Sequence, residues 1–401
     1  MKAEKQKKMS LSSYYAPTRV TLGRNAEENV ALELKKENAK KVLIHYGSGR
    51  VEKNGLLARI TSLLDKEGIG YTLLGGVVPN PRLSLVRKGI EKAKKEGVDF
   101  ILAVGGGSVI DSSKAIAYGL AYKGDVWDFY SKKAVPQGSF PVGCILTMAA
   151  AGSEMSDSSV ITNDEEDNLK RGCNSDWCRL KFALLNPEFT FTLPSFQTGC
   201  AVVDIQMHTL ERFFVKETLP LTDALSLALL RTVRDAGYKA LSNPSDYDAR
   251  ATLMWASSLS HNGLMATGNS SRGDWATHQI EHELSGKYDI AHGAGLSAVW
   301  PSWARYTLSA APGRFATLGY SLYGIEPTGD AVRDGEKTIE EAEKFYRSIN
   351  MPIRLSELNI FPSDDDIEEL AEKCSFHSTR TIGDIMKLTK ADIAEIYRMA
   401  R

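Results

Sequence analysis

The stretch from residue 41 to about residue 187 alternates short apolar runs with segments whose apolar residues recur at the helical period. The apolar runs predict strands at 41–47 and 71–77 and a strand that runs into a turn at 100–108, while helices are predicted to end at Gly68 and Gly97. Strand–helix–strand order implies crossover helices and therefore parallel strands. The pattern predicts an open α/β sheet, and such sheets bind ligands at the carboxyl ends of their strands.

The pattern changes after "NPEFTFTLPS", which ends at residue 195. The later residues carry few β-branched runs and show helical periodicity at 221–241, 246–268, 337–349, 364–374 and 390–400. We therefore expect a boundary near Pro194, with an α/β domain at 1–193 and an all-helical domain at 194–401. The acidic stretches Asp364–Asp366 and Glu336–Glu343 fit helix first turns and solvated faces.

Composition limits the partners of the chain. It has 401 residues and a formal net charge of −1, so no global field attracts nucleic acid or an anionic membrane. No run of 18 apolar residues is present, so we expect no membrane span. The start "MKAEKQKK" lacks an apolar segment and is interpreted as a solvated tail. Five cysteines, an odd number, favour reduced thiols and a cytoplasmic location. A small-molecule partner is expected.

A glycine-rich turn follows the strand that begins at residue 100. In "ILAVGGGSVIDSSKAIA", Gly105, Gly106, Gly107 and Ser108 lie between the strand and a helix. Glycines allow close approach of a ligand to the backbone, and the free N–H groups of a helix start bind anions. This design suits a pyrophosphate, although the turn is not the G-x-G-x-x-G fingerprint and a tight turn without a ligand is the alternative.

A second glycine turn, "YGSGR", follows the strand at 41–47, where the adenosine end of a dinucleotide is expected. NAD specificity usually needs a carboxylate on the ribose, whereas NADP needs a cation for its 2′-phosphate. The turn offers Ser48, Arg50 and Lys53, against one acid, Glu52. It therefore favours NADP(H) over NAD(H), the alternative being that Arg50 points into solvent.

Five residues of the second half carry metal-ligand chemistry. Asp204 and His208 are four apart, and so are His278 and His282, which places each pair on one helix face. His292 follows fourteen residues after His278, far enough to leave the helix and turn back. Each pair alone could be a helix-surface contact. Together, histidine nitrogens and a carboxylate suit zinc or iron(II) with a position open for substrate. Cys173 and Cys178 have no second cysteine pair and are not expected to bind metal.

The combination of "GGGSVIDSSK", "DIQMH" and "HQIEHELSGKYDIAH" resembles the iron-containing (group III) alcohol dehydrogenase family. Within that family the chain most resembles the NADPH-dependent aldehyde reductase and butanol dehydrogenase branch. Further matching stretches are "YYAPTRVTLG", "GGVVPNP", "TFTLPS", "MPIRLSELNI" and "DIAEIYRMA". The resemblance implies a Rossmann-like dinucleotide-binding domain and an all-α metal-binding and substrate domain, in the dehydroquinate-synthase-like architecture, and a homodimer.

The resemblance also implies roles for particular residues. It implies that Asp204, His208, His278 and His292 bind one divalent metal, Fe²⁺ or Zn²⁺, and that His282 is a non-ligand beside the reacting centre. It assigns cofactor contacts to Gly47, Ser48, Gly49, Arg50, Gly105, Gly106, Gly107, Ser108, Asp111, Thr147 and Lys170. The chain departs from the family pattern at "LTMAAAGSE", Val109-Ile110 and Asn186-Pro187. These departures affect expectations about cofactor affinity and leave the metal ligands intact.

The leading hypothesis is reversible hydride transfer between NADP(H) and a small aldehyde or primary alcohol, with His282 either carrying a proton or supporting a ligand. Trp127, Phe129, Met148 and Trp275 are the candidate pocket residues. The alternatives are a dehydroquinate-synthase-like lyase, a glycerol or diol dehydrogenase, and a metal-free binding protein. The lyase would need a dense basic cluster, and near the histidines the sequence shows Lys287 and Arg272 alone.

Overall fold

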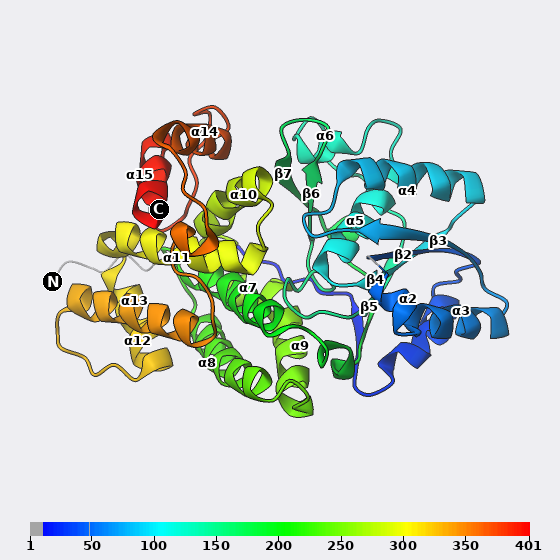
Figure 1. The fold of residues 1–401 in the computed structure, drawn as a ribbon, viewed down its shortest axis with the longest axis horizontal. Helices are drawn as coiled ribbons and strands as arrows, with labels where there is room; N and C mark the ends of the chain where they lie inside the picture. Colours follow the sequence, from blue (N-terminus) through cyan, green and yellow to red (C-terminus); the bar gives the residue numbers. More distant parts are fainter. Residues whose placement is uncertain (1–10, 48) are drawn as a thin grey trace.

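The computed structural model describes residues 11–47 and 49–401, and it has an α/β part and a helical part that lie side by side (Figure 1). The α/β part is built on a six-stranded sheet in the order β1-β8-β5-β4-β2-β3, in which every neighbouring pair is parallel. The strands are β1 (Arg19–Leu22), β2 (Lys41–Gly47), β3 (Gly70–Val77), β4 (Phe100–Gly105), β5 (Val142–Leu146) and β8 (Phe182–Leu185). The parallel sheet and helical second half confirm the expected fold class.

Alternate residues of the buried strands pack on opposite faces of this sheet, as the period of a strand requires. On one face Leu43, Ile101 and Ala103 pack in one core with α4 (Leu83–Glu96) and α5 (Gly107–Leu120). On the other face Val42, Phe100 and Leu102 pack in a second core with α1 (Val30–Lys36) and α3 (Leu56–Lys66). The strand interiors are apolar on both sides because both faces are covered. The short helices α2 and α6 span Arg50–Lys53 and Trp127–Tyr130.

Several strands of the α/β part were not named in the sequence analysis. They include β1, β5 and β8 of the main sheet, and β1 adds an edge strand beside β8. An antiparallel hairpin of β6 (Ser158–Asn163) and β7 (Leu169–Asn174) also lies outside the main sheet. Both strands are short and mix polar with apolar residues, so they lack the apolar run by which a strand is recognised. The hairpin packs against α5 through β6 and against α10 through β7.

The helical part contains the long helices of the second half. They are α7 (Ser195–Phe213), α8 (Pro220–Ser242), α9 (Tyr247–His261), α10 (Ala276–Tyr288), α11 (His292–Thr307), α12 (Pro312–Tyr323), α13 (Ala331–Ser348), α14 (Asp364–Cys374) and α15 (Lys390–Ala400). The helix expected over 246–268 ends earlier, at His261, because Gly263 and Gly268 adopt φ values of +95° and +80°. The predicted boundary near Pro194 falls just before α7 begins at Ser195.

Short 3-10 helices complete the chain. They are η1 (Ala26–Asn29), η2 (Asp176–Cys178), η3 (Pro187–Thr190), η4 (Leu264–Ala266), η5 (Leu308–Ala310) and η6 (Leu355–Leu358). The acidic stretch at 364–366 forms the first turn of α14, where Ser363 and Asp366 make a capping box. Acidic side chains there complement the helix dipole.

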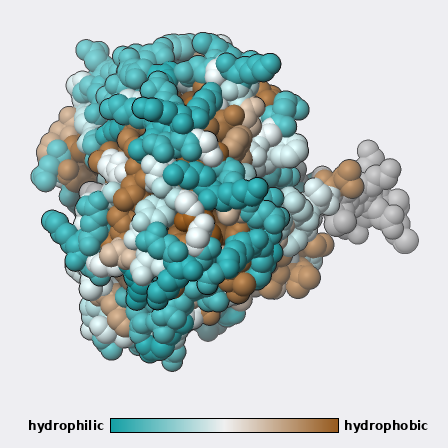
Figure 2. All heavy atoms as spheres, turned by 90° about the vertical axis from the view of Figure 1, so that its right-hand side faces the viewer, coloured by the Kyte–Doolittle hydropathy of each residue, from teal (hydrophilic) through white to brown (hydrophobic). Residues whose placement is uncertain are grey.

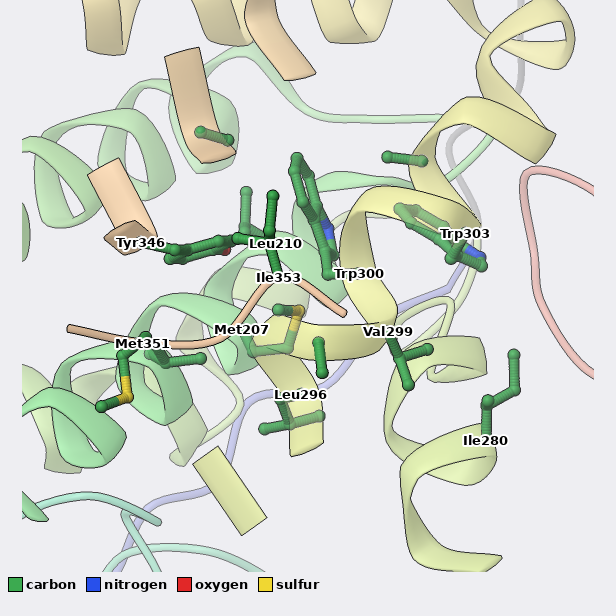
Figure 3. Close-up of a cluster of buried hydrophobic side chains, with 14 of the residues drawn as sticks. Met207, Leu210, Ile280, Leu296, Val299, Trp300, Trp303, Tyr346, Met351 and Ile353 are labelled. Carbon is green, nitrogen blue, oxygen red and sulfur yellow. The ribbon is translucent and has the colours of Figure 1, made fainter. Parts of the chain in front are cut away.

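The core of the helical part holds α7, α10 and α11 in fixed positions. Trp300 and Trp303 of α11 are 1% and 2% exposed, and they pack near Met207 of α7 and Tyr346 of α13 (Figure 3). Each large apolar side chain buried in this way contributes roughly 1.5–3 kcal/mol to the free energy of unfolding. Because α7 is buried along most of its length, polar residues on it, including Asp204 and His208, are carried into the interior.

The outer surface of the α/β part is largely hydrophilic (Figure 2). Among residues 11–47 and 49–401, no helix is long and apolar enough to cross a membrane. The expectation for "MKAEKQKK" concerns residues 1–8, which lie outside the described residues.

Candidate active site

Four side chains expected to bind a metal converge where α7, α10 and α11 meet. Asp204 and His208 lie one turn apart on α7, His278 lies on α10, and His292 is the first residue of α11. Asp204 Oδ1 lies 3.6 Å from His208 Nδ1, 3.8 Å from His278 Nε2 and 3.8 Å from His292 Nε2. Separations of this size allow each atom to lie about 2.0–2.2 Å from a shared cation.

The polar atoms of this cluster fit a cation because they have no other partner. Asp204, His208 and His278 are 4–5% exposed. Asp204 Oδ1, His208 Nδ1 and His278 Nε2 make no hydrogen bond to any described residue. Leaving three buried polar atoms unpaired costs free energy, and a bound cation would remove that cost. The donor set, imidazole nitrogens and one carboxylate, suits Zn²⁺ or Fe²⁺.

The electrostatics of the cluster also favour positive charge. Burial alone would raise the pKa of Asp204, but His278, His292 and His261 hold it below its usual value. Burial would lower the pKa of His278, but the carboxylates of Asp204 and Glu211 outweigh it and raise the pKa to about 9. The two carboxylates thus stabilise positive charge at His278, whereas burial and the neighbouring His278 lower the pKa of His208.

Two glutamates orient the histidines, and the sequence interpretation missed both. His278 Nδ1 donates to Glu211 Oε1 at 3.0 Å, and His292 Nδ1 donates to Glu281 Oε2. A histidine whose Nδ1–H is held in this way presents its Nε2 lone pair to a metal. A signal existed in the sequence, since Glu211 and Glu281 each lie three residues after a ligand candidate and share its helix face.

His282 lies beside the ligand candidates without a hydrogen bond to any described residue. Its ring centroid is 6.4 Å from that of His278 and 5.7 Å from that of His292. Glu281, His282 and His292 form a second group of possible ligands. However, Glu281 already accepts from His292 and from the Ser285 hydroxyl, and it faces the Lys170 ammonium at 3.5 Å. The satisfied carboxylate makes this second group a poorer metal site than the first.

A close contact between backbones places His292. The next residue, Gly293, lies against α7, where a Cβ on Gly293 would be 2.2 Å from the Cys200 carbonyl oxygen. No side chain fits there without moving one helix. The glycine therefore sets how near the start of α11 lies to Asp204.

A cleft of about 730 Å³ runs between the two parts of the chain and reaches the metal cluster. This volume is in the range of cofactor and substrate sites. The helical part contributes all five candidates, namely Asp204, His208, His278, His282 and His292. The α/β part contributes Gly107, Ser108, Asp111 and Lys170.

The glycine turn between β4 and α5 leaves its backbone open to the cleft. A Cβ on Gly107 would lie 2.8 Å from the Cβ of Ala151, and one on Gly106 would lie 3.2 Å from the Cβ of Met148. A Cβ on Gly105 would lie 2.4 Å from a methyl group of Val109, the residue that departs from the family pattern. The turn needs glycine at these positions whether or not a ligand binds, and the α5 N–H groups behind it fit a pyrophosphate.

Three further cofactor candidates lie around this turn in different roles. Asp111 accepts from the Ser153 hydroxyl and from the Val160 N–H at 3.0 Å, and burial raises its pKa. It thereby ties β6 to α5. Thr147 follows β5 and donates its N–H to the Gly105 carbonyl at 3.0 Å. The Lys170 ammonium lies 3.5 Å from His292 Nδ1, so it faces the metal cluster.

The second glycine turn lies at the end of β2. Gly47 ends the strand and Arg50 begins α2, while Ser48 lies outside the described residues. A separate hollow of about 440 Å³ is lined by Gly49, Arg50, Lys53 and Asn54. The Arg50 guanidinium donates to the Thr192 carbonyl at 2.7 Å, so its side chain is held at the junction of the two parts.

The pocket candidates divide into two groups. Met148 and Trp275 line the cleft, whereas Trp127 and Phe129 belong to α6 and are buried in the core of the α/β part. The cleft is also more basic than the sequence suggested. It is lined by Lys132, Lys170, Arg171, Arg212, Arg272 and Arg380. Lys287, one of the two cations noted near the histidines, instead pairs with Asp366 and Glu369 on α14. The folded cleft thus brings together more cations than the two noted near the histidines, because residues far apart in the chain line it.

Comparison with known proteins identifies the family. The family described as iron-containing alcohol dehydrogenase matches residues 17–187, and its C-terminal family matches residues 198–401. The chain is 40% identical over 391 residues to a Bacillus subtilis protein named probable NADH-dependent butanol dehydrogenase 2, covering 96% of this chain and 98% of that one. It is 30% identical over 397 residues to the Escherichia coli NADPH-dependent aldehyde reductase YqhD, covering 98% and 100%.

A solved structure shows the same fold. The crystal structure of NADH-dependent butanol dehydrogenase A from Thermotoga maritima matches with a TM-score of 0.94 and 35% identity, covering 98% of this chain and 99% of that one. The fold and the family define a metal-dependent oxidoreductase of alcohols and aldehydes that uses a divalent metal and a nicotinamide cofactor. The chain belongs to the iron-containing alcohol dehydrogenase family.

Proposed function

We propose that this enzyme interconverts small aldehydes and primary alcohols of about the size of butanal, with NADP(H) as the hydride carrier. The observation that carries the proposal is the set of unpaired atoms on Asp204, His208 and His278, which line the same cleft as the β4–α5 glycine turn. Relatives named as butanol dehydrogenases support the substrate size.

Asp204, His208, His278 and His292 are the proposed metal ligands. A divalent metal held by these four residues would supply a Lewis acid for the carbonyl oxygen of an aldehyde. Glu211 and Glu281 hold the two imidazoles of α10 and α11 in the orientation that this requires. Iron(II) and zinc both suit the donor set.

His282 is the proposed proton donor for the alcohol oxygen during aldehyde reduction. It lines the cleft beside His278 and His292, and no described residue occupies its nitrogens. A positioned imidazole accelerates proton transfer by about 10²–10⁴-fold. His282→Ala should therefore retain its metal and lose rate. A His282→Ala enzyme with full metal and the full rate across the pH range would refute this role and leave His282 as support for a ligand.

The cofactor is proposed to extend from the cleft at the β4–α5 glycine turn to the separate hollow at the second glycine turn. Gly105, Gly106, Gly107 and Ser108 would take the pyrophosphate, with Asp111, Thr147 and Lys170 beside it, and 47–50 would take the adenosine ribose. The nicotinamide cofactor supplies the hydride.

The proposed preference for NADP(H) rests on Arg50. Within residues 11–47 and 49–401 no carboxylate lies within 4.0 Å of its guanidinium, which leaves its charge for a 2′-phosphate. Glu52, the one acid near this turn, accepts from the Tyr46 hydroxyl at 2.7 Å. Names of relatives specify both NADH and NADPH.

The test is a metal analysis of the purified protein coupled to NADPH and NADH oxidation with a series of short aldehydes. We expect one metal per chain and loss of NADPH absorbance with butanal. Absence of turnover with every carbonyl would refute the oxidoreductase proposal and favour a lyase. A clear preference for NADH would overturn the role given to Arg50, and Arg50→Gln, with Lys53 intact, would then leave the preference unchanged.

A homodimer and a cytoplasmic location complete the proposal. Family likeness supports the dimer, and sedimentation of the purified enzyme tests it. All five cysteines are buried and free, which supports a reducing compartment. Fractionation of the cells that make the protein tests the location.

A further inference from the structure

Three cations from distant parts of the chain gather at one side of the cleft. Lys132 follows α6, Arg171 lies on β7, and Arg380 lies between α14 and α15, and all three line the cleft that contains the metal cluster. Figure 1 shows β7 on the side of the hairpin that faces α10, whereas the glycine turn opens α5, on which β6 packs. Arg171 is therefore on the strand that packs against α10, whereas the turn proposed to bind the pyrophosphate opens the helix on which the other strand packs.

The cluster has more positive than negative charge. Arg171 pairs with Glu283, its Nη1 lying 2.8 Å from Oε1. In the part of the chain that the structure describes, no carboxylate lies within 4.0 Å of Lys132 or Arg380. Lys132 instead donates to the Gly172 carbonyl at 2.6 Å, and Arg380 donates twice to the Cys374 carbonyl, at 3.0 and 2.8 Å. Three cations thus face one carboxylate.

The cations also repel one another. Desolvation lowers the pKa of the Lys132 ammonium, and the nearby Arg380 and Arg171 guanidinium groups lower it further. Desolvation likewise lowers the pKa of Arg380, and Arg171 contributes in the same direction. Like charges held together at a cleft wall favour a bound anion, which would relieve the repulsion.

The guanidinium groups are held in place by an aromatic ring. The Arg380 guanidinium lies 3.5 Å from the centroid of the Phe376 ring, and the Arg171 guanidinium lies 5.0 Å from it. Phe376, His377 and Ser378 adopt left-handed φ values of +49°, +55° and +58°, a conformation that non-glycine residues rarely hold without a compensating contact. This turn carries Phe376 and Arg380, which both line the cleft.

We propose that the preferred substrates are aldehydes that carry a carboxylate at the end remote from the carbonyl, and that Arg171, Arg380 and Lys132 bind this carboxylate. The proposal rests on the oxidoreductase function proposed above and names its substrate class. An arginine presents paired N–H donors that match the two oxygens of a carboxylate. The reaction at the other end is unchanged: the carbonyl carbon gains a hydride, its oxygen gains a proton, and NAD(P)H becomes NAD(P)⁺.

The test compares butanal with 4-oxobutanoate, which have the same number of carbons and differ in the methyl or carboxylate at the far end. The specificity ratio is kcat/KM for 4-oxobutanoate divided by kcat/KM for butanal, measured with the metal-loaded enzyme. We expect a ratio of at least about ten for the wild type, lowered at high salt by screening of the cations. Arg380→Gln and Lys132→Gln should each lower the ratio about tenfold through KM for 4-oxobutanoate. Arg380→Lys should restore part of it.

Matched variants separate the outcomes. Lys133→Gln removes the neighbouring cation, which does not line the cleft, and should leave the ratio unchanged. Arg380 also donates to the Cys374 carbonyl at the end of α14, so Arg380→Gln can disturb folding. Lys132→Gln then tests the proposal independently. A wild-type ratio below one, or a ratio unaffected by both variants, contradicts the proposal. A raised KM for NAD(P)H with an unchanged ratio would assign the cations to the cofactor. Failure with butanal as well would refute the oxidoreductase function itself.

Discussion

Replacing Gly293 by alanine tests whether the spacing between α7 and α11 builds the metal cluster. The added Cβ would lie 2.2 Å from the Cys200 oxygen and 2.7 Å from the Cys200 carbonyl carbon. Non-bonded atoms in ordinary contact are farther apart than this, so the backbones of α7 and α11 must separate by roughly 1 Å. His292 immediately precedes Gly293, and Asp204 lies one turn after Cys200, so the separation moves one ligand candidate away from another.

Both stability and metal binding should respond. Overpacking of this kind costs about 1–3 kcal/mol in the free energy of unfolding, which urea denaturation of the metal-free protein measures. A ligand must be held within about 0.5 Å of its working position, so the displacement should weaken metal binding by at least about tenfold. Competition with a chelator of known affinity measures that loss.

Gly313→Ala is the matched control. Gly313 is also the second residue of its helix, and a Cβ there would meet nothing within 4 Å. Alanine should leave metal affinity unchanged and leave stability unchanged or raised by about 0.5–1 kcal/mol, because glycine is the poorer helix former. If Gly293→Ala unfolds at the same urea concentration as the wild type and binds metal equally well, the spacing argument is wrong.

Three further predictions concern the support of the site and the α/β core. Glu211→Gln removes the carboxylate that orients His278 and should lower metal affinity about 10–100-fold with the fold intact by circular dichroism. Burial lowers the pKa of His45 to about 4 from 6.5, so the unfolded chain takes up the proton first. The contribution of neutral His45 to the free energy of unfolding is then fully present above about pH 6.5 and falls by up to about 3 kcal/mol as the pH drops toward 4. Denaturation of His45→Asn should lack this part of the pH dependence. Removal of bound metal by a chelator should lower Tm. Adding back metal at about 1,000 times its Kd should raise the free energy of unfolding by about 4 kcal/mol. A Tm independent of metal would contradict the last expectation.

Much of the fold could be predicted from the sequence because its strong signals are local. The apolar runs that became β2, β3 and β4 and the glycines that end α3 and α4 are read within a few residues. The same holds for the helical pairs, since four-residue spacing places Asp204 with His208 on α7 and His278 with His282 on α10. The hairpin of β6 and β7 was missed because its short strands mix polar and apolar residues.

The parts of the site that could not be predicted depend on tertiary contacts. Spacing alone does not distinguish His282 from His278 as a ligand. We propose His278 rather than His282 as the ligand because Glu211 orients the His278 ring, whereas no described residue bonds His282. Likewise Lys132, Arg171 and Arg380 are separated by tens to hundreds of residues, and the folded chain alone brings them to one wall of the cleft.

The most direct test of the account is the metal content of two variants beside the wild type, measured by elemental analysis after identical loading. We assign the metal to Asp204, His208, His278 and His292, with His282 outside the ligand set. We expect about one metal per chain in the wild type and in His282→Ala, and almost none in Asp204→Ala. Full metal in Asp204→Ala together with its loss from His282→Ala would place the ion at Glu281, His282 and His292 and contradict the central claim.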